Sequence, residues 1–305
     1  MEIKQLEYFL AVCKELHFTR AAEKLNISQP SLSQQIRILE AEIGMPLFDR
    51  IGKKIRITDT GKHLLKHSRN IFLELEKIRN SVDDIKELET GRVSIGGLLT
   101  VVTYLLPPAI LRYHELYPKI ELVVSGLRSD DIRKQLIQGD LDLGILIMDE
   151  DDDDMEELES IPLYTENLAL AVPITHELAD KDVVSLEVLK NTSNILFPDN
   201  FFTRRLLDKH CKSLGFELHA FLEMTTMESL LTMVENGAGV TVLPKSYLEF
   251  KQLKNIRIIP LVNPPPIGDL GIFYLKAKYM NRATRAFIDE LLSSLKDKQY
   301  DLIRP

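Results

Sequence analysis

Hydrogen-bonding side chains recur along one short stretch near the N-terminus. Gln29, Ser31, Ser33, Gln34 and Arg37 fall on the outward face of a helix that we expect to begin after Ser28. Side chains of these types reach base edges in a DNA major groove. A solvent-facing helix is polar too, so this stretch alone leaves a base-reading face and an ordinary solvated face both open.

A cluster of cations follows a few residues later. Four cations lie within seven residues: Arg50, Lys53, Lys54 and Arg56. Ile55 and Ile57 alternate with polar residues, which predicts a small two-stranded wing that turns at Gly52. Cations beside a base-reading helix are what neutralisation of DNA phosphates requires.

Two short helices must position these side chains. We expect the first over residues 18–25, with Thr19 as its N-cap and Arg20 in its first turn. Ser28 is the expected N-cap of the second, Pro30 is tolerated in its first turn, and Gly44 ends it. Two short helices joined by a three- or four-residue turn are typical of a helix-turn-helix. Four residues at the starts of these helices are therefore further candidates for DNA contact: Thr19, Arg20, Ser28 and Pro30.

A long helix is expected over residues 60–88. Its apolar residues follow a 4-3-4-3 spacing with Ser68 at the one interruption: Leu64, Ile71, Leu75, Ile78, Val82 and Ile85. A helix with such a seam must bury it against another helix, and a second copy of the chain is the simplest partner. The sequence therefore predicts dimerisation through this helix.

From Gly91 onward, short apolar runs alternate with helical patterns. This alternation predicts an α/β domain with a largely parallel sheet. Strands are expected at 92–96, 120–125, 141–147, 168–172, 194–197, 218–223, 240–243, 256–261 and 270–275, and helices near 104–117, 130–138, 203–214, 228–236 and 281–298. One large sheet and two lobes are both compatible with this length. For two lobes, we expect the chain to cross near 162–165 and 264–268.

Ligands of open α/β sheets bind where strands end and helices begin. Four hydroxyl side chains at such points are candidates for one crevice: Thr100, Ser129, Thr203 and Thr226. Val101 and Phe202 lie beside two of them. Arg128 and Arg204 are candidates to pair with a carboxylate ligand. Each hydroxyl group has an alternative role as a helix cap, and each arginine an alternative place on the solvated surface.

Charge is distributed unevenly along the 305 residues. The whole chain carries a net charge of −8, but residues 1–70 hold twelve Lys or Arg against eight Asp or Glu, and residues 91–305 hold 23 against 32. This asymmetry predicts an N-terminal module that faces a polyanion and a C-terminal part with another role. The composition excludes a wholly disordered chain and a collagen-like fibre.

Several other classes of chemistry lack their motifs. The two cysteines, Cys13 and Cys211, stand far apart and predict neither a disulfide framework nor a zinc site. No phosphate loop, nucleophile elbow or metal-binding histidine motif is present, so we expect no catalytic residue, metal or cofactor. Neither a secretory signal nor an apolar stretch of membrane-spanning length occurs, which predicts a soluble cytoplasmic protein.

Residues 2–66 resemble the winged helix-turn-helix domain of LysR-type transcriptional regulators. The matching residues are Phe18-Thr19-Arg20-Ala21-Ala22, Leu25, Ser28-Gln29-Pro30-Ser31, Ser33, Gln35-Ile36, Leu39-Glu40, Gly44, Leu47-Phe48, Arg50, Thr58 and Gly61. Similarity continues more weakly at 139–143 and 237–244. The resemblance implies an α+β and α/β protein with a winged helix-turn-helix at 1–58, a linker helix at 59–90 and an effector-binding domain at 91–305. It also implies that this domain has two lobes, as periplasmic solute-binding proteins do, at about 91–163 with 267–305 and at 164–266.

The leading hypothesis is therefore a sequence-specific DNA-binding regulator, a homodimer or homotetramer on promoter DNA, controlled by a small anionic metabolite. An enzyme or solute-binding protein built on the α/β domain is a second hypothesis, weakened by the missing motifs and signal. An architectural DNA binder is a third, and it would not need about 215 acidic α/β residues.

Overall fold

The computed structural model describes residues 1–51, 54–83, 91–148 and 156–296. The chain forms two compact units. The first comprises Met1–Ile85 with Ala277–Tyr279, and the second comprises Lys86–Lys276 with Met280–Pro305. Each is described below by itself.

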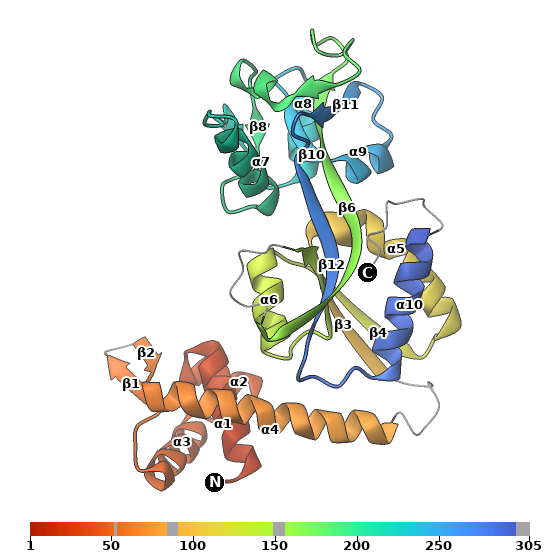
Figure 1. Ribbon diagram of the computed structural model, residues 1–305. Helices are drawn as coiled ribbons and strands as arrows, with labels where there is room; N and C mark the ends of the chain where they lie inside the picture. The colour runs from red at the N-terminus through yellow and green to blue at the C-terminus, as the bar shows by residue number, and fades with distance from the viewer. Residues whose placement is uncertain (52–53, 84–90, 149–155, 297–305) are drawn as a thin grey trace. The chain divides into compact units, whose positions relative to one another are not determined.

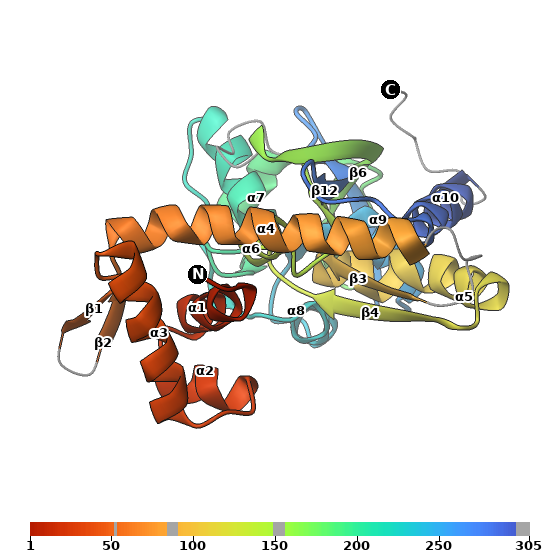
Figure 2. The ribbon, with the colours of Figure 1, turned by 90° about the horizontal axis from the view of Figure 1, so that it is seen from below.

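The first unit contains four helices and one hairpin among its described residues. These elements are α1 (Ile3–Glu15), α2 (Phe18–Lys24), α3 (Gln29–Ile43), β1 (Phe48–Ile51), β2 (Lys54–Ile57) and α4 (Asp59–Asp83). Phe9, Val12, Leu32, Ile36 and Leu39 are fully buried and hold the first three helices together. Figures 1 and 2 both show the hairpin beside the start of α4.

Helix caps in this unit confirm two predictions and correct a third. The Ser28 hydroxyl group accepts a hydrogen bond from the Ser31 amide at 3.3 Å, and Gly44 ends α3 in the left-handed conformation. Thr19 does not cap α2. His17 does so, because α2 begins at Phe18, and the His17 ring accepts from the Arg20 amide.

The hairpin confirms the predicted wing. Its two strands are antiparallel, with Asp49 opposite Arg56. The predicted turn at Gly52 lies outside the described residues. Gly61 then lets α4 start close to the hairpin, since a Cβ there would collide with the Leu47 carbonyl oxygen.

A mixed sheet forms the second unit, in the order β4-β3-β5-β12-β6-β11-β7 with β10 also paired to β6. Its strands are β3 (Gly91–Gly97), β4 (Ile120–Gly126), β5 (Leu143–Ile147), β6 (Leu158–Pro173), β7 (Val184–Ser185), β10 (Thr241–Pro244), β11 (Ile256–Val262) and β12 (Ile267–Leu275). The expectation of a largely parallel sheet is wrong. β6 and β12 run antiparallel to each other and to their other partners, because these long strands connect the two lobes in opposite directions (Figure 1).

Helices cover both lobes. They are the π-helical turn η1 (Val101–Leu105), α5 (Leu106–Leu116), α6 (Ser129–Ile137), the 3₁₀ turn η3 (Leu186–Lys190), α7 (Phe202–Ser213), α8 (Met227–Glu235), α9 (Lys245–Lys251) and α10 (Arg282–Lys296). In Figure 1, α6 lies on one face of the first lobe's sheet, and α5 and α10 on the other. The sequence did not predict β7, η3 or α9, which are all short.

Two expected strands of the second lobe are much shorter than predicted. Only Ile195–Leu196 (β8) and Leu222–Glu223 (β9) pair, in a small parallel sheet of their own. One apolar core runs through both lobes, and a second, smaller core lies within the second lobe. The α/β domain that the sequence predicts is confirmed, with the two lobes that the family resemblance implies joined by one continuous sheet.

Candidate functional site

The solvent face of α3 carries most of the predicted base-reading side chains. Ser28, Gln29, Pro30, Ser31, Gln34 and Arg37 are all exposed. They are spaced so that the opposite face of α3, with Leu32, Ile36 and Leu39, is fully buried. The structure therefore presents a continuous polar surface one helix face wide, which is the width that a major groove admits.

Ser33 is the exception. Its side chain is buried, and its hydroxyl group accepts a hydrogen bond from Gln29 Nε2 at 2.8 Å. The expectation that Ser33 projects outward is wrong, because position 33 falls next to the buried stripe at Leu32 and Ile36. Its role is to fix the orientation of the Gln29 amide group.

Other predicted DNA contacts lie on α2 and on the hairpin. Thr19 and Arg20 are exposed, and Arg20 Nη2 also donates to the Glu15 carbonyl oxygen at 3.3 Å. Arg56 is exposed on β2. Lys53 and the side chains of Arg50 and Lys54 lie outside the described part of the chain.

The predicted seam of α4 is partly exposed. Ile71 and Ile78 are 38% and 55% exposed, and Leu64 and Leu75 are half-buried. Ile85 and the Val82 side chain lie outside the described residues. Exposed isoleucines on a long helix are apolar surface that association with another helix would cover.

A cleft of about 330 Å³ opens in the second unit where three helices begin. Ser129 opens α6, Phe202 opens α7, and Met227 opens α8, and all three residues line the cleft. The first amide groups of a helix have no partners within the helix and carry partial positive charge. Three such ends around one cleft favour an anionic group in it.

The cleft walls are mainly apolar. Phe197 and Phe201 stack in parallel, and Phe202 lies next to them in sequence. Leu99 is 48% exposed, although it is a large apolar residue at the edge of a buried core. The remaining apolar side chains of the lining are Leu98, Leu127 and Met227. An apolar ligand body would cover this surface.

Five of the predicted effector residues line this cleft: Thr100, Arg128, Ser129, Phe202 and Thr203. Ser129 is buried and is the first residue of α6, with Arg128 at the N-cap position, so the expectation that Ser129 caps the helix is wrong. Arg128 is exposed, with Nη2 4.0 Å from Asp130 Oδ2.

The other three predicted residues lie elsewhere. Val101 is buried and lines a smaller cavity next to the cleft. Thr226 caps α8 by accepting from the Ser229 amide at 3.2 Å, whereas its neighbour Thr225 lines the cleft. Arg204 is a structural residue.

Arg204 bonds to four groups of its own lobe. Its guanidinium group donates to Asp208 at 3.1 Å and to Glu223 at 3.0 Å, and it also reaches the carbonyl oxygens of Phe197 and Leu218. These contacts use four of the five N–H donors of the guanidinium group, so no pair of donors remains for a bidentate contact with a ligand carboxylate. The expectation that Arg204 pairs with the ligand is wrong, and Arg205, which does line the cleft, takes its place as a candidate.

Sequence reasoning missed the aromatic wall. Phe201 stands beside Phe202 in a polar loop between a strand and a helix, and an apolar pair in such a loop was the available signal.

In the described ranges, no group of three or more His, Cys, Asp or Glu side chains is placed to hold a metal ion. Likewise, none of the helices in those ranges has the length and apolar character to cross a membrane.

Comparison with known proteins matches both parts of the chain. Residues 3–62 match the family of bacterial regulatory helix-turn-helix proteins of the lysR type, and residues 86–296 match the LysR substrate binding domain. The DNA-binding transcriptional dual regulator OxyR of Escherichia coli K12 is 30% identical over 297 residues, which cover 95% of this chain and 96% of the relative. A hydrogen peroxide-inducible genes activator of Dickeya chrysanthemi is 30% identical over 275 residues, which cover 90% and 89%.

Solved structures agree. A full-length OxyR variant from Pseudomonas aeruginosa matches with a TM-score of 0.76 at 25% identity, covering 96% of this chain and 98% of that one. Full-length CbnR in complex with its target DNA shares the fold, with a TM-score of 0.62 at 21% identity over 96% and 100% of the two chains. The chain therefore belongs to the LysR family of transcriptional regulators, which are DNA-binding proteins rather than enzymes and respond to small molecules through their second domain.

Proposed function

We propose that α3 reads operator bases and that the hairpin contacts the DNA backbone. The exposed row of Gln29, Ser31, Gln34 and Arg37 supports the first assignment. The cations of the β1–β2 segment, Arg50, Lys53, Lys54 and Arg56, support the second through their sequence positions. The exposed isoleucines of α4 support a homodimer, or a homotetramer built from dimers, that acts in the cytoplasm on promoter DNA.

The effector that the cleft fits best is a carboxylate with an apolar, flat body. The observation that carries this proposal is the meeting of three helix N-termini beside the stacked rings of Phe197 and Phe201. Helix ends, with Arg128 and Arg205, suit the carboxylate group, and the aromatic wall suits the body. This narrows the small anionic metabolite expected from the sequence.

Several relatives are named hydrogen peroxide-inducible genes activators. Peroxide acts on proteins through thiolates of low pKa that solvent reaches. Cys211 is the only cysteine in residues 91–305, it is fully buried, and burial raises its pKa to about 11. Its thiol group is thus protonated and shielded at neutral pH, so we propose that this chain responds to a bound ligand rather than to peroxide.

Calorimetry of the full-length protein with a panel of carboxylates tests the effector class. Benzoate and phenylacetate are the aromatic probes, and acetate and succinate are the polar ones. Saturable binding of an aromatic probe that is lost in Thr100→Ala supports the proposal. Equal or tighter binding of succinate would show that the apolar wall plays no part in selection.

A further inference from the structure

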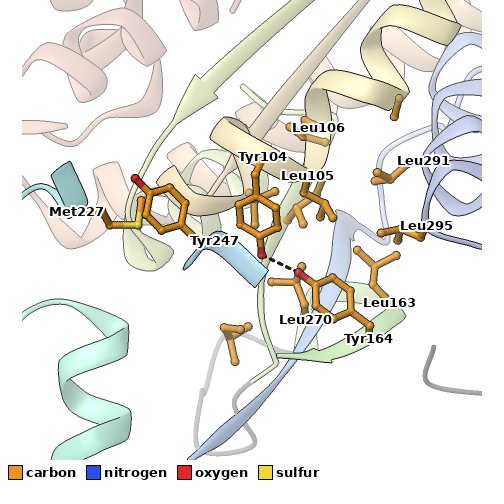
Figure 3. Packing of buried hydrophobic residues seen from close by; sticks show 14 of the residues in the cluster. Tyr104, Leu105, Leu106, Leu163, Tyr164, Met227, Tyr247, Leu270, Leu291 and Leu295 are labelled. Carbon is orange, nitrogen blue, oxygen red and sulfur yellow. Dashed lines mark hydrogen bonds between the residues drawn. The ribbon is translucent and has the colours of Figure 1, made fainter. Parts of the chain in front are cut away.

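Four oxygen atoms of the second unit form a tight buried cluster. They belong to Tyr104 on η1, Tyr164 and Glu166 on β6, and Ser246 on α9. The Tyr104 hydroxyl group lies 2.8 Å from that of Tyr164, 2.7 Å from Glu166 Oε2 and 2.6 Å from Ser246 Oγ. Figure 3 shows the two phenol groups meeting hydroxyl to hydroxyl.

Two more contacts complete the cluster. The Tyr164 hydroxyl group is 3.1 Å from Glu166 Oε2, and Ser246 Oγ also contacts this oxygen. Five close contacts therefore connect four oxygen atoms. Each contact needs a proton between its two oxygens, because lone pairs at this distance repel each other.

Counting protons distinguishes the two states of Glu166. The three hydroxyl groups supply three protons, so an ionised Glu166 leaves two of the five contacts without one. A protonated Glu166 supplies a fourth proton, which Oε2 donates to Ser246 Oγ, so that only one of the five contacts lacks a proton. The observed packing therefore fits the neutral carboxyl group better than the carboxylate.

Burial acts in the same direction. Glu166 is 8% exposed, and burial raises the pKa of its carboxyl group above the ordinary value, against the lowering effect of its hydrogen bonds to Ser246, Tyr104 and Tyr164. Burial likewise raises the pKa of Tyr104, so both phenol and carboxyl groups favour their neutral forms.

Several charged groups on the neighbouring elements form contacts with partners other than Glu166. On β10, Thr241–Pro244 carries no charge, and on β11, Arg257 lies opposite Val172, away from Glu166 along β6. Contacts of this kind on α8, α9, β6 and β12 include Lys245–Glu249, Lys251–Glu228, Tyr247–Glu228, Thr165–Asp269 and Tyr274–Glu159. None of these groups is among the causes of the shift at Glu166.

The cluster adjoins the cleft. Glu166 and Tyr104 line a cavity of about 30 Å³ together with Thr100 and Thr203, and both threonines also line the cleft. Tyr104 belongs to η1, and Thr100 is the residue that immediately precedes it. Whatever holds Tyr104 therefore also fixes the place of Thr100.

We propose that Glu166 is a positioning residue for the effector cleft, and that its carboxyl group carries a proton which closes the Tyr104–Tyr164–Ser246 cluster and so holds η1 and Thr100 in place. Ionisation removes that proton, raises the number of contacts without a proton from one to two, and loosens η1. Only the consequence for effector affinity rests on the proposed function.

Three variants of the full-length protein test this. Glu166→Gln keeps the shape and the donor of a neutral carboxyl group, Glu166→Ala removes both, and Glu159→Gln is the control. Glu159 lies on the same strand and also accepts from a tyrosine, Tyr274, at 2.7 Å, but it is exposed. Infrared spectroscopy should show the carbonyl band of a protonated carboxylic acid, absent in Glu166→Gln and present in Glu159→Gln.

Hydrogen exchange at residues 98–105 and melting temperature give the second readout. The pKa of Glu166 is higher in the folded protein than in the unfolded chain. Its contribution to stability is therefore full below the unfolded-state pKa and is lost as pH rises through the folded-state pKa. The wild type should therefore lose stability relative to Glu166→Gln as pH rises. Compared with the wild type, the backbone amides of η1 should exchange roughly tenfold faster in Glu166→Ala and at an unchanged rate in Glu166→Gln.

Probe binding gives a third readout. Benzoate affinity should fall as pH rises in the wild type but not in Glu166→Gln, in titrations kept above the pKa of benzoic acid so that the probe stays ionised throughout. The proposal would be overturned if the wild type lacked the band of a protonated carboxylic acid. It would also be overturned if Glu166→Gln changed amide exchange and melting temperature as much as Glu166→Ala does. If no carboxylate probe binds any variant, the effector class is wrong, and the infrared and exchange results still decide on Glu166.

Discussion

Phe197 and Phe201 lie face to face, with ring centroids 4.7 Å apart and ring planes 7° from parallel. A tight turn closed by the Phe201 amide on the Pro198 carbonyl oxygen, at 3.0 Å, brings them together. Phe197 is buried, whereas Phe201 is half-buried and immediately precedes α7. The pair therefore extends the core into the cleft, where it presents an apolar wall beside a helix N-terminus.

Phe201→Leu should weaken binding of an aromatic carboxylate by about 0.5–1.5 kcal/mol, because leucine keeps apolar surface but loses the ring. Binding of a polar carboxylate should not change. Calorimetry with benzoate and succinate measures both. Phe221→Leu is the matched control, since Phe221 is 69% exposed and does not line the cleft. Equal losses for both variants would show that the effect does not come from the cleft.

Substitution of Arg128 should affect ligand binding, whereas substitution of Arg204 should affect the stability of the fold. Arg204→Ala removes two ion pairs and two bonds to carbonyl oxygens, so it should lower the free energy of unfolding by about 2–3 kcal/mol. Arg128→Ala should leave stability nearly unchanged, because Arg128 is exposed, and should weaken carboxylate binding. Chemical denaturation and calorimetry on the two variants check this, and the reverse pattern would restore Arg204 as the ligand's partner.

The sequence predicts the helix-turn-helix well because its signals are local. Ser28 and Gly44 bound α3, and their chemistry acts within one turn of the backbone. Ser33 was misplaced because a polar residue beside a buried stripe is settled only by packing. At Arg204, Asp208 is a local partner four residues along the same helix, but Glu223 and the Leu218 carbonyl oxygen come from outside that helix and are brought to it by the fold.

Long-range pairing explains the other differences. β6 and β12 are antiparallel because two strands must cross between lobes in opposite directions, and no local pattern records the direction of a neighbouring strand. Glu166 did leave a sequence signal, as a charged residue just before the apolar run Leu168–Val172. Its meaning depends on Tyr104 and Ser246, which are 62 and 80 residues away.

Cys211→Ala should leave the response to effector and the affinity for DNA unchanged. Treatment of the wild type with hydrogen peroxide should likewise not alter DNA binding, because a buried thiol group with a pKa of about 11 holds almost no thiolate at neutral pH. Gel shifts before and after treatment, with mass spectrometry of the cysteine, measure this. A peroxide effect present in the wild type and absent in Cys211→Ala would establish thiol sensing.

Gln34→Ala should cost about 1–3 kcal/mol on promoter DNA and little on random DNA, because a lost base contact affects only the specific complex. Arg56→Ala should weaken binding to both DNAs. It should also make binding less dependent on salt concentration, by the amount expected for the loss of about one phosphate contact. Gel shifts over a range of salt concentrations measure both effects. Asn70→Ala is the control for Gln34, since Asn70 is an exposed amide side chain on α4. Equal weakening by Gln34→Ala on both DNAs would make Gln34 a backbone contact.

The paired change of Leu75 and Ile78 to Asp should produce monomers that bind promoter DNA poorly. Ile78 is 55% exposed and Leu75 half-buried, so charge there should disrupt an interface between copies more than the fold of either unit. DNA binding falls with dimerisation because two recognition helices at a fixed spacing contact two half-sites. Sedimentation and gel shifts measure the two effects, with the exposed pair Lys66→Asp and Asn70→Asp as a charge control on the same helix. An intact dimer after both changes at 75 and 78 would exclude α4 as the main contact between the two copies. Monomers that still bind promoter DNA at full affinity would show that one recognition helix is enough.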